Sequence, residues 1–152
     1  MMPASTERVQ QHTCEDVNQW IREQTEQRVA RYQYASVESI NQRLAELDHE
    51  WDVERTLEAN AATLACTGCV LTAFVHRRWV LLPMAVTGFL LQHAIQGWCP
   101  PLPILRRLGF RTQHEIDEER FALKVLRGDF ATEALTGPEP ANTGAIMRSV
   151  RS

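Results

Sequence analysis

The feature that most constrains this chain is its central segment, residues 59–105, which contains no Asp or Glu and only two basic residues, Arg77 and Arg78. The two arginines are adjacent, so they divide the segment into two apolar stretches and give neither stretch a polar face for water. A soluble helical domain of this size rarely buries two neighbouring helices on all sides. The pattern therefore predicts an all-α protein with a two-helix transmembrane hairpin.

Both apolar stretches are long enough to cross a bilayer as helices. Residues 57–75 form one stretch and residues 79–98 form the other. Each would extend about 28 Å as a helix, close to the thickness of the hydrocarbon layer. A tryptophan at each end of the second stretch is typical of a membrane span. The side chains expected at the membrane interfaces are Trp79, Trp98, Arg77, Arg78, Arg106 and Arg107.

The charged residues lie outside the central segment and exclude several classes of protein. Residues 1–58 carry twelve acids and six arginines, and residues 106–152 carry seven acids and eight basic residues. The net charge of -3 gives no basic surplus, so no nucleic-acid partner is expected. Residues 1–8 contain no apolar run, so no secretory signal peptide is expected. The cysteines are too few and too dispersed for a secreted disulfide framework, and they are Cys14, Cys66, Cys69 and Cys99.

The regions on either side of the spans have the signals of amphipathic helices. Thr112 and Glu115 have the spacing of a capping box, and Gly128 fits the position after a helix C-terminus. The expected helices run from Asp16 to about Tyr34, from Ser36 or Ser39 onward, and over residues 113–127. The expected parts are a flexible tail (1–13), an N-terminal helical region (14–56), the membrane hairpin with its exit motif (57–112), a C-terminal helix (113–130) and a disordered tail (131–152).

Large apolar residues in the N-terminal region recur at spacings of four, three and four. Such a seam packs either on a neighbouring helix of the same chain or on a second copy. We expect a homo-oligomer, most simply a two-fold dimer, in which this seam sets the specificity. The seam consists of Ile40, Leu44, Leu47 and Trp51.

Small residues recur every four positions along the first apolar stretch. A stripe of this kind lets another membrane helix approach closely. Its partner is either a second copy or the second stretch, through Ala85, Gly88 or Ala94. The stripe consists of Ala61, Ala65, Cys69 and Ala73.

The arginines around the spans predict an orientation. The connecting turn holds two, Arg77 and Arg78, whereas five flank the hairpin within about twenty residues. By the positive-inside rule both termini are expected in the cytoplasm. The five flanking residues are Arg43, Arg55, Arg106, Arg107 and Arg111.

The order of features between about residue 55 and residue 112 resembles a known family. The two apolar stretches are followed by Gly97-Trp98-Cys99-Pro100, by residues 102–105 and by Leu108-Gly109-Phe110-Arg111-Thr112. This region resembles the YgaP-like inner-membrane family, small bacterial proteins and domains that occur alone or fused to a rhodanese. The resemblance implies an all-α protein with two spans in the bacterial inner membrane. The Cys-Arg-x-Gly-x-Arg loop of a rhodanese does not occur in the chain, so no sulfurtransferase site is expected.

The cysteines offer the only candidate nucleophiles. Cys66 and Cys69 have C-x-x-C spacing, but they lie inside an apolar stretch and are expected to act as small packing residues. Cys99 is the stronger candidate because it precedes prolines at the expected interface. The nearby Arg106 and Arg107 would favour its thiolate.

No other constellation predicts a cofactor or a metal site. No haem-attachment or zinc-ligand spacing accompanies the C-x-x-C pair. His93 lies one turn before Gly97, where the simplest expectation is that its ring reaches the membrane interface.

The sequence therefore predicts a non-enzymatic membrane protein that contacts the lipid bilayer and assembles with itself or within a larger membrane complex. One alternative is a membrane-bound thiol or persulfide relay through Cys99. Another is a soluble helical interaction module.

Overall fold

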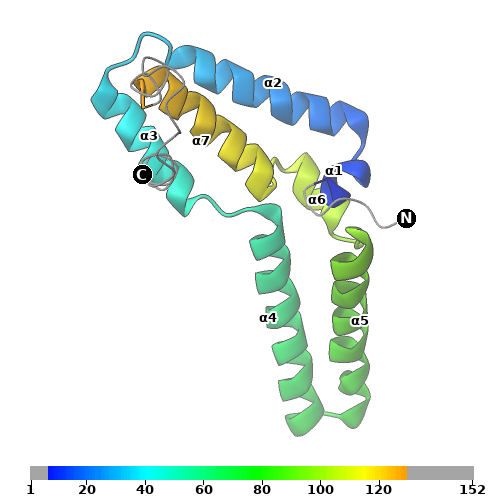
Figure 1. Cartoon of the computed structure of the whole chain (residues 1–152). Coiled ribbons are helices and arrows are strands. Elements are labelled where there is room, and N and C mark those ends of the chain that lie inside the picture. The colour runs from blue at the N-terminus through cyan, green and yellow to red at the C-terminus, as the bar shows by residue number, and fades with distance from the viewer. Residues whose placement is uncertain (1–6, 130–152) are drawn as a thin grey trace, which may run out of the picture. The chain divides into compact units, whose positions relative to one another are not determined.

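The computed structural model describes residues 7–129, and these residues form helices without any strand (Figure 1). This confirms the all-α prediction. The described chain divides into two compact units, one of residues 7–23 and 51–116 and the other of residues 24–50 and 117–129. The helices are α1 (Arg8–Gln11), α2 (Glu15–Arg31), α3 (Val37–His49), α4 (Val53–Phe74), the 3-10 helix η1 (Arg77–Val80), α5 (Leu81–Gln96), α6 (Leu102–Arg107) and α7 (Gln113–Arg127).

Local capping signals set several helix starts. The Ser36 side chain accepts a hydrogen bond from the backbone N–H of Ser39 at 3.3 Å, so α3 begins after one of its two predicted caps. At α7 the predicted capping box is formed. The Thr112 N–H donates to Glu115 Oε2 at 2.8 Å, and the Glu115 N–H donates to Thr112 Oγ1 at 3.3 Å.

The expectations for α2 and for the N-terminal tail need correction, and the expectation for the C-terminal tail falls outside the described residues. The helix α2 begins at Glu15, so Asp16 lies in its first turn rather than at its cap, and it ends at Arg31 rather than near Tyr34. Part of the predicted flexible tail forms α1, whose Val9 is buried. The predicted disordered tail, residues 131–152, lies outside the described residues.

The core of the first unit joins α1 to the start of α4 and the end of α5. Gly97 ends α5 with a φ of 79°, and a Cβ atom there would lie 2.7 Å from the Cβ of Arg8. Only glycine fits both the left-handed backbone and this close approach. The Arg8 guanidinium donates to the Ala94 carbonyl at 3.1 Å and pairs with Glu54 at 2.6 Å. The buried cluster around these contacts consists of Val9, Val53, Leu57, Cys99, Leu102 and Leu105.

The helices α4 and α5 lie side by side within the first unit (Figure 1). The two helices touch at Gly68, where a Cβ atom would lie 2.5 Å from Pro83 Cδ and 3.2 Å from Leu82 Cβ. The absence of a side chain at this position therefore allows the two helices to touch.

The small-residue stripe faces α5 only in part. Ala61 and Ala65 are half-buried, but Cys69 and Ala73 are exposed. A spacing of four residues rotates by about 40° per step around a helix with 3.6 residues per turn, so the stripe turns away from α5 along its length. The proposed partner residues on α5 are also exposed, and these are Ala85, Gly88 and Ala94.

The predicted seam is buried within the second unit rather than left free for a second copy. Ile40, Leu44 and Leu47 are 3%, 8% and 2% exposed. Its fourth predicted member, Trp51, follows α3 and is 47% exposed, with the Arg55 guanidinium 4.4 Å from its ring centre. The prediction that this seam forms a dimer interface is therefore wrong.

Ion pairs connect α3 to α7 in the second unit. The buried carboxylate of Glu119 pairs with Arg43 at 2.9 Å and with Arg28 at 3.2 Å. Arg120 of α7 also pairs with Asp48 of α3 at 2.9 Å. These bonds hold α3 against α7, which explains why the apolar residues of α3 are covered without a partner chain.

Candidate functional site

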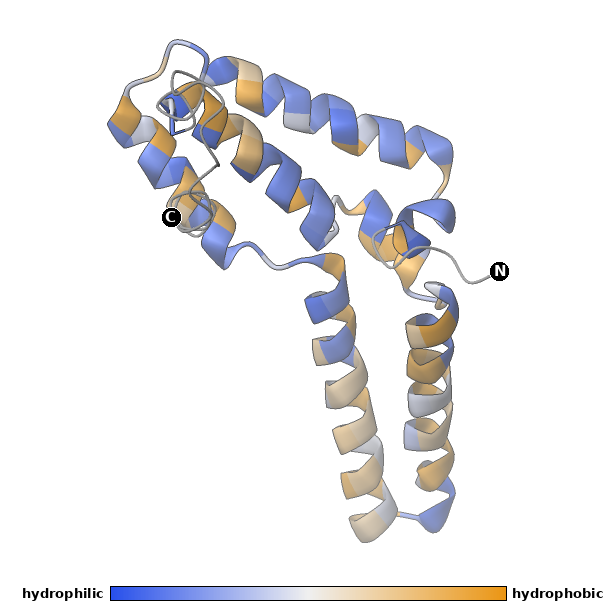
Figure 2. Cartoon of the chain, viewed as in Figure 1, coloured by the Kyte–Doolittle hydropathy of each residue, from blue (hydrophilic) through white to orange (hydrophobic). Residues whose placement is uncertain are grey.

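The main candidate site is the apolar surface of α4 and α5. Two helical stretches, Val37–Phe74 and Arg77–Gln96, are long and apolar enough to cross a membrane. Each contains an 18-residue window with a mean hydropathy of 1.3. The first includes both α3 and α4. Hydrophilic residues are interspersed along α3, whereas most of α4 is apolar (Figure 2). Only 11% and 6% of the two apolar windows are buried.

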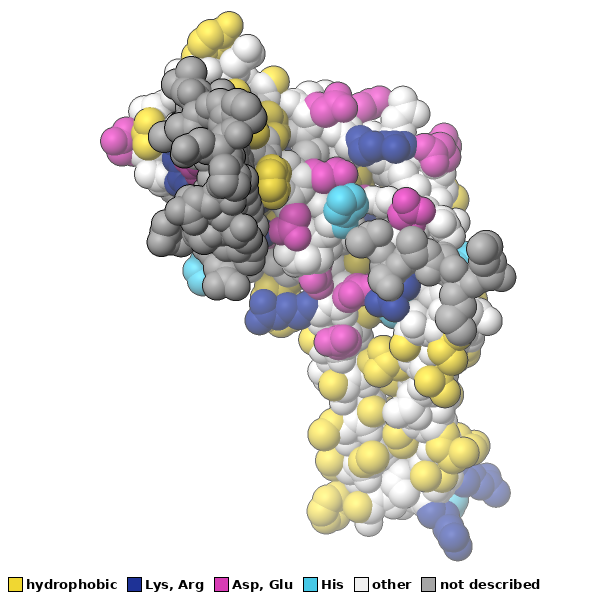
Figure 3. Space-filling model, viewed as in Figure 1, with side chains coloured by type: hydrophobic (Ala, Val, Ile, Leu, Met, Phe, Trp, Pro, Cys, Tyr) yellow, Lys and Arg dark blue, Asp and Glu magenta, His cyan; other side chains and the backbone are white. Residues whose placement is uncertain are grey.

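This exposure distinguishes the pair from the core helices of a soluble domain, which are mostly buried. Hydrophobic side chains cover α4 and α5 in the space-filling view (Figure 3). An exposed apolar surface of this extent is typical of a protein–protein or membrane interaction site. Its large exposed members include Leu64, Val70, Phe74, Leu81, Met84, Phe89, Leu91 and Ile95.

The polar side chains of α4 and α5 are mostly satisfied within their own helices. The hydroxyls of Thr63, Thr72 and Thr87 each donate to the carbonyl four residues earlier, at 2.7 Å. Thr67 makes the same bond at 2.8 Å. Pro83 lies in the first turn of α5, where its missing N–H removes no helix hydrogen bond. Both features suit helices that have no water to bond with.

The connection between the two helices is short, basic and exposed. His76 caps η1 by accepting a hydrogen bond from the Arg78 N–H at 3.1 Å. Arg77 and Arg78 are exposed, and Trp79 is 43% exposed. These three predicted interface residues therefore lie at one end of the apolar pair and can contact an interface.

At the other end of the pair, the predicted interface residues separate into different environments. Trp98 is half-buried and Arg107 is exposed. Arg106 is fully buried, so its predicted position facing the headgroups is wrong. The sequence pattern could not distinguish the two adjacent arginines, because within residues 7–129 only Arg106 has a hydrogen-bond or ion-pair partner.

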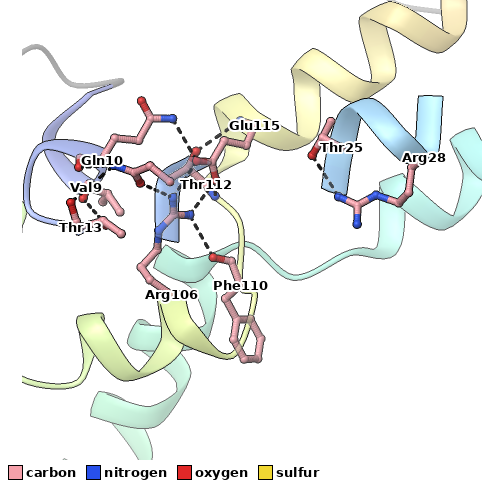
Figure 4. Close-up of polar contacts among 10 residues, drawn as sticks. Val9, Gln10, Thr13, Thr25, Arg28, Arg106, Phe110, Thr112 and Glu115 are labelled. Atoms are coloured by element: carbon pink, nitrogen blue, oxygen red, sulfur yellow. Dashed lines mark hydrogen bonds and ion pairs between the residues drawn. The ribbon is translucent and has the colours of Figure 1, made fainter. Parts of the chain in front are cut away.

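Arg106 is held in a dense polar cluster within the first unit (Figure 4). Its two terminal nitrogens donate to the two carboxylate oxygens of Glu115, each at 2.7 Å. They also donate to the Phe110 carbonyl at 3.1 Å and to Asn18 Oδ1 at 3.0 Å. Gln10 adds a hydrogen bond to Glu115 at 3.1 Å. The cluster therefore joins α1, α2, α6 and the start of α7.

The cluster keeps Glu115 ionised. Burial raises the pKa of this carboxyl group, but the hydrogen bonds and the charge of Arg106 outweigh burial, helped by the Thr112 N–H. The pKa of Glu115 therefore lies below its ordinary value. This bidentate arginine–carboxylate pair is almost fully enclosed and joins α6 to the start of α7.

Cys99 does not have the environment expected of a reactive thiol. It belongs to the buried core of the first unit and is 4% exposed, rather than partly wet. Burial raises the pKa of its thiol, and a hydrogen bond from the backbone of Leu102 offsets only part of that effect. Arg106 is occupied by Glu115, and Arg107 is exposed.

The two cysteines of the C-x-x-C pair are both exposed on α4, so they do not pack between α4 and α5 as expected. Within residues 7–129, no group of three or more His, Cys, Asp or Glu side chains could hold a metal ion.

Comparison of the chain with family models, curated proteins and solved structures finds no match. The resemblance to the YgaP-like family therefore stays a prediction.

Proposed function

We propose that this chain is a two-span integral membrane protein of the bacterial inner membrane, similar to the YgaP-like family, in which α4 and η1–α5 form a transmembrane hairpin. Its helical regions outside the bilayer mediate assembly, without catalysis. The observation that supports this proposal best is the low burial of two apolar helices, 11% and 6%.

The dimensions of the helices support the same proposal. The 22 residues of α4 extend about 33 Å, and the 20 residues of Arg77–Gln96 extend about 30 Å. Both lengths match a hydrocarbon layer of about 30 Å.

Membrane fractionation of the full chain tests the proposal. We expect the protein to sediment with membranes and to stay there after washing with high salt and alkaline carbonate, until detergent releases it. As a control, α4 can be made water-compatible by placing Glu at Leu64, Val70 and Phe74, and this variant should be released by carbonate. Release of the unaltered chain would favour the soluble interaction module instead.

Assembly is proposed to use the exposed face of α4, because the seam of α3 is already covered. Ala62, Cys66, Cys69 and Ala73 are all exposed and follow at spacings of four, three and four. This spacing keeps the small residues on one face, unlike a spacing of four throughout. In a bilayer, close packing of small residues is what holds helices together.

Cross-linking of the native cysteines in isolated membranes tests this face. In a two-fold dimer each residue near the axis meets its own copy. Mild oxidation should therefore yield a disulfide-linked dimer that is lost when both Cys66 and Cys69 are replaced by Ser. Replacing Cys14 by Ser is the matched control and should leave the dimer intact. A chain that gives no dimer, or one that depends on Cys14, would contradict assembly through α4.

A further inference from the structure

A cavity of about 400 Å³ lies in the first unit beside the apolar pair of helices. Its volume is within the range of small-molecule sites, about 300–1,000 Å³. Its walls are almost entirely apolar and come from three helices and from residues 99–101 between α5 and α6. The helices contribute, among others, Leu57, Ala61 and Leu64 from α4, Phe89 and Leu90 from α5, and Ile104 from α6.

One buried polar side chain in this cavity has no partner among the described residues. His93 lines the cavity and is only 5% exposed. Neither of its ring nitrogens, Nδ1 or Nε2, has a hydrogen-bond partner within residues 7–129. Buried polar groups are almost always bonded, so an unbonded imidazole in a cavity indicates that a ligand completes the site.

The other polar wall residue does not supply that partner. Asn60 directs its side-chain amide to the carbonyl of Thr56, at 2.9 Å. His93 is thus the group that selects the ligand, and a neutral imidazole offers one donor and one acceptor.

We propose that the cavity binds an amphipathic membrane lipid, whose polar carbonyl or hydroxyl group hydrogen-bonds to His93 while its hydrocarbon chain lies against α4 and α5. A purely apolar molecule would leave the imidazole unbonded, and a water-soluble polar ligand would leave the apolar walls uncovered. His93 lies in the last turn of α5, at the depth where the polar groups of a lipid meet its chains. The inference rests on the proposed membrane insertion of this pair of helices.

Photo-cross-linking tests this proposal on the full chain purified in mild detergent. The probe is a sixteen-carbon fatty acid that carries a diazirine in the middle of its chain. We expect mass spectrometry to find the label on the cavity-lining segments of α4, α5 and α6. Palmitic acid and a short-chain ubiquinone serve as competitors that distinguish an acyl lipid from an isoprenoid quinone. Hexadecane lacks the polar group and should compete far less than either.

Two pairs of measurements locate the site. Ala61→Trp fills the cavity and should abolish the label, whereas Ala85→Trp, at an exposed position on α5 outside the cavity, should not. His93→Phe keeps an aromatic ring and removes the hydrogen-bonding group. This substitution should weaken competition by the polar competitors about tenfold, which corresponds to the loss of one hydrogen bond of about 1.4 kcal/mol. Competition by hexadecane should not change. This variant removes an unbonded buried group, so we expect it to fold.

Label spread evenly over the exposed faces of α4 and α5 and insensitive to Ala61→Trp would overturn the proposal, because it would reflect non-specific contact of the probe with the apolar surface. Unchanged competition in His93→Phe would overturn it as well. A chain that fractionates with membranes but shows no label in the cavity refutes the lipid site alone. A chain released by carbonate that still labels there refutes membrane insertion alone.

Discussion

Gly68 shows how a single missing side chain sets the distance between two helices. A Cβ atom at Gly68 would clash with Pro83, whereas a Cβ atom at Gly88 of α5 would have no neighbouring atom within 4 Å. We expect Gly68→Ala to destabilise the protein by about 1–3 kcal/mol because the helices must separate. Gly88→Ala should be neutral or slightly stabilising because alanine favours a helix. Thermal unfolding of both variants in detergent measures the difference, and equal melting temperatures would contradict it.

Cys99 provides a second test at the scale of a residue. Burial raises the pKa of its thiol above the ordinary value, which disfavours the reactive thiolate. We expect Cys99 to react with a maleimide at least about tenfold more slowly than the exposed Cys14 in the purified protein. Mass spectrometry at successive times gives the two rates. Faster labelling of Cys99 would revive the thiol or persulfide relay.

At the scale of the helices, the pair of Arg106 and Glu115 makes stability depend on pH. The pKa of Glu115 is lowered in the folded chain, below its ordinary value of 4.5. The stabilisation by this ion pair is therefore fully present when the pH is above the ordinary pKa of Glu115. It is lost as the pH falls from that value toward the lowered pKa of the folded chain. Glu115→Gln should cost about 3 kcal/mol at pH 7 and reduce the acid sensitivity of unfolding.

Denaturant unfolding at pH 7 and at pH 4 measures this effect. Glu26→Gln is the control because Glu26 is an exposed acid on α2. If the two variants lose the same stability, the cluster does not hold the helices together.

Helix starts and the apolar pair could be predicted because their signals are local. Ser36 and the box of Thr112 and Glu115 act within one turn. The contact of Gly68 with Pro83 depends on how two helices rotate against each other, which the periodicity of one helix does not specify. The burial of Arg106 depends on a partner nine residues away across a turn, so its position facing lipid headgroups was predicted wrongly.

The prediction of a dimer interface at the seam of α3 failed for a related reason. Its spacing predicted a buried face correctly, since Ile40, Leu44 and Leu47 are all covered. Periodicity does not say whether the covering helix belongs to the same chain or to another. Here the ion pairs of Glu119 hold α7 of the same chain against α3.

At the scale of the whole molecule, the proposed topology has a direct test. In a background with the four native cysteines replaced by Ala, Arg77→Cys should react with a membrane-impermeant maleimide in intact cells. Arg107→Cys, the matched exposed position beyond α5, should react only after the inner membrane is permeabilised. The reason is the excess of flanking arginines, which favours cytoplasmic termini. The reverse labelling pattern would invert the orientation.

The enclosure of Arg106 implies an order of events during biogenesis. The positive-inside rule acts on the nascent chain, when Arg106 is still a hydrated charge that resists translocation. Once Glu115 has neutralised it, the same side chain can no longer act as a topological signal. In the proposed topology, orientation is therefore decided before this part of the chain folds, and reinsertion in the opposite sense would first require the pair to break.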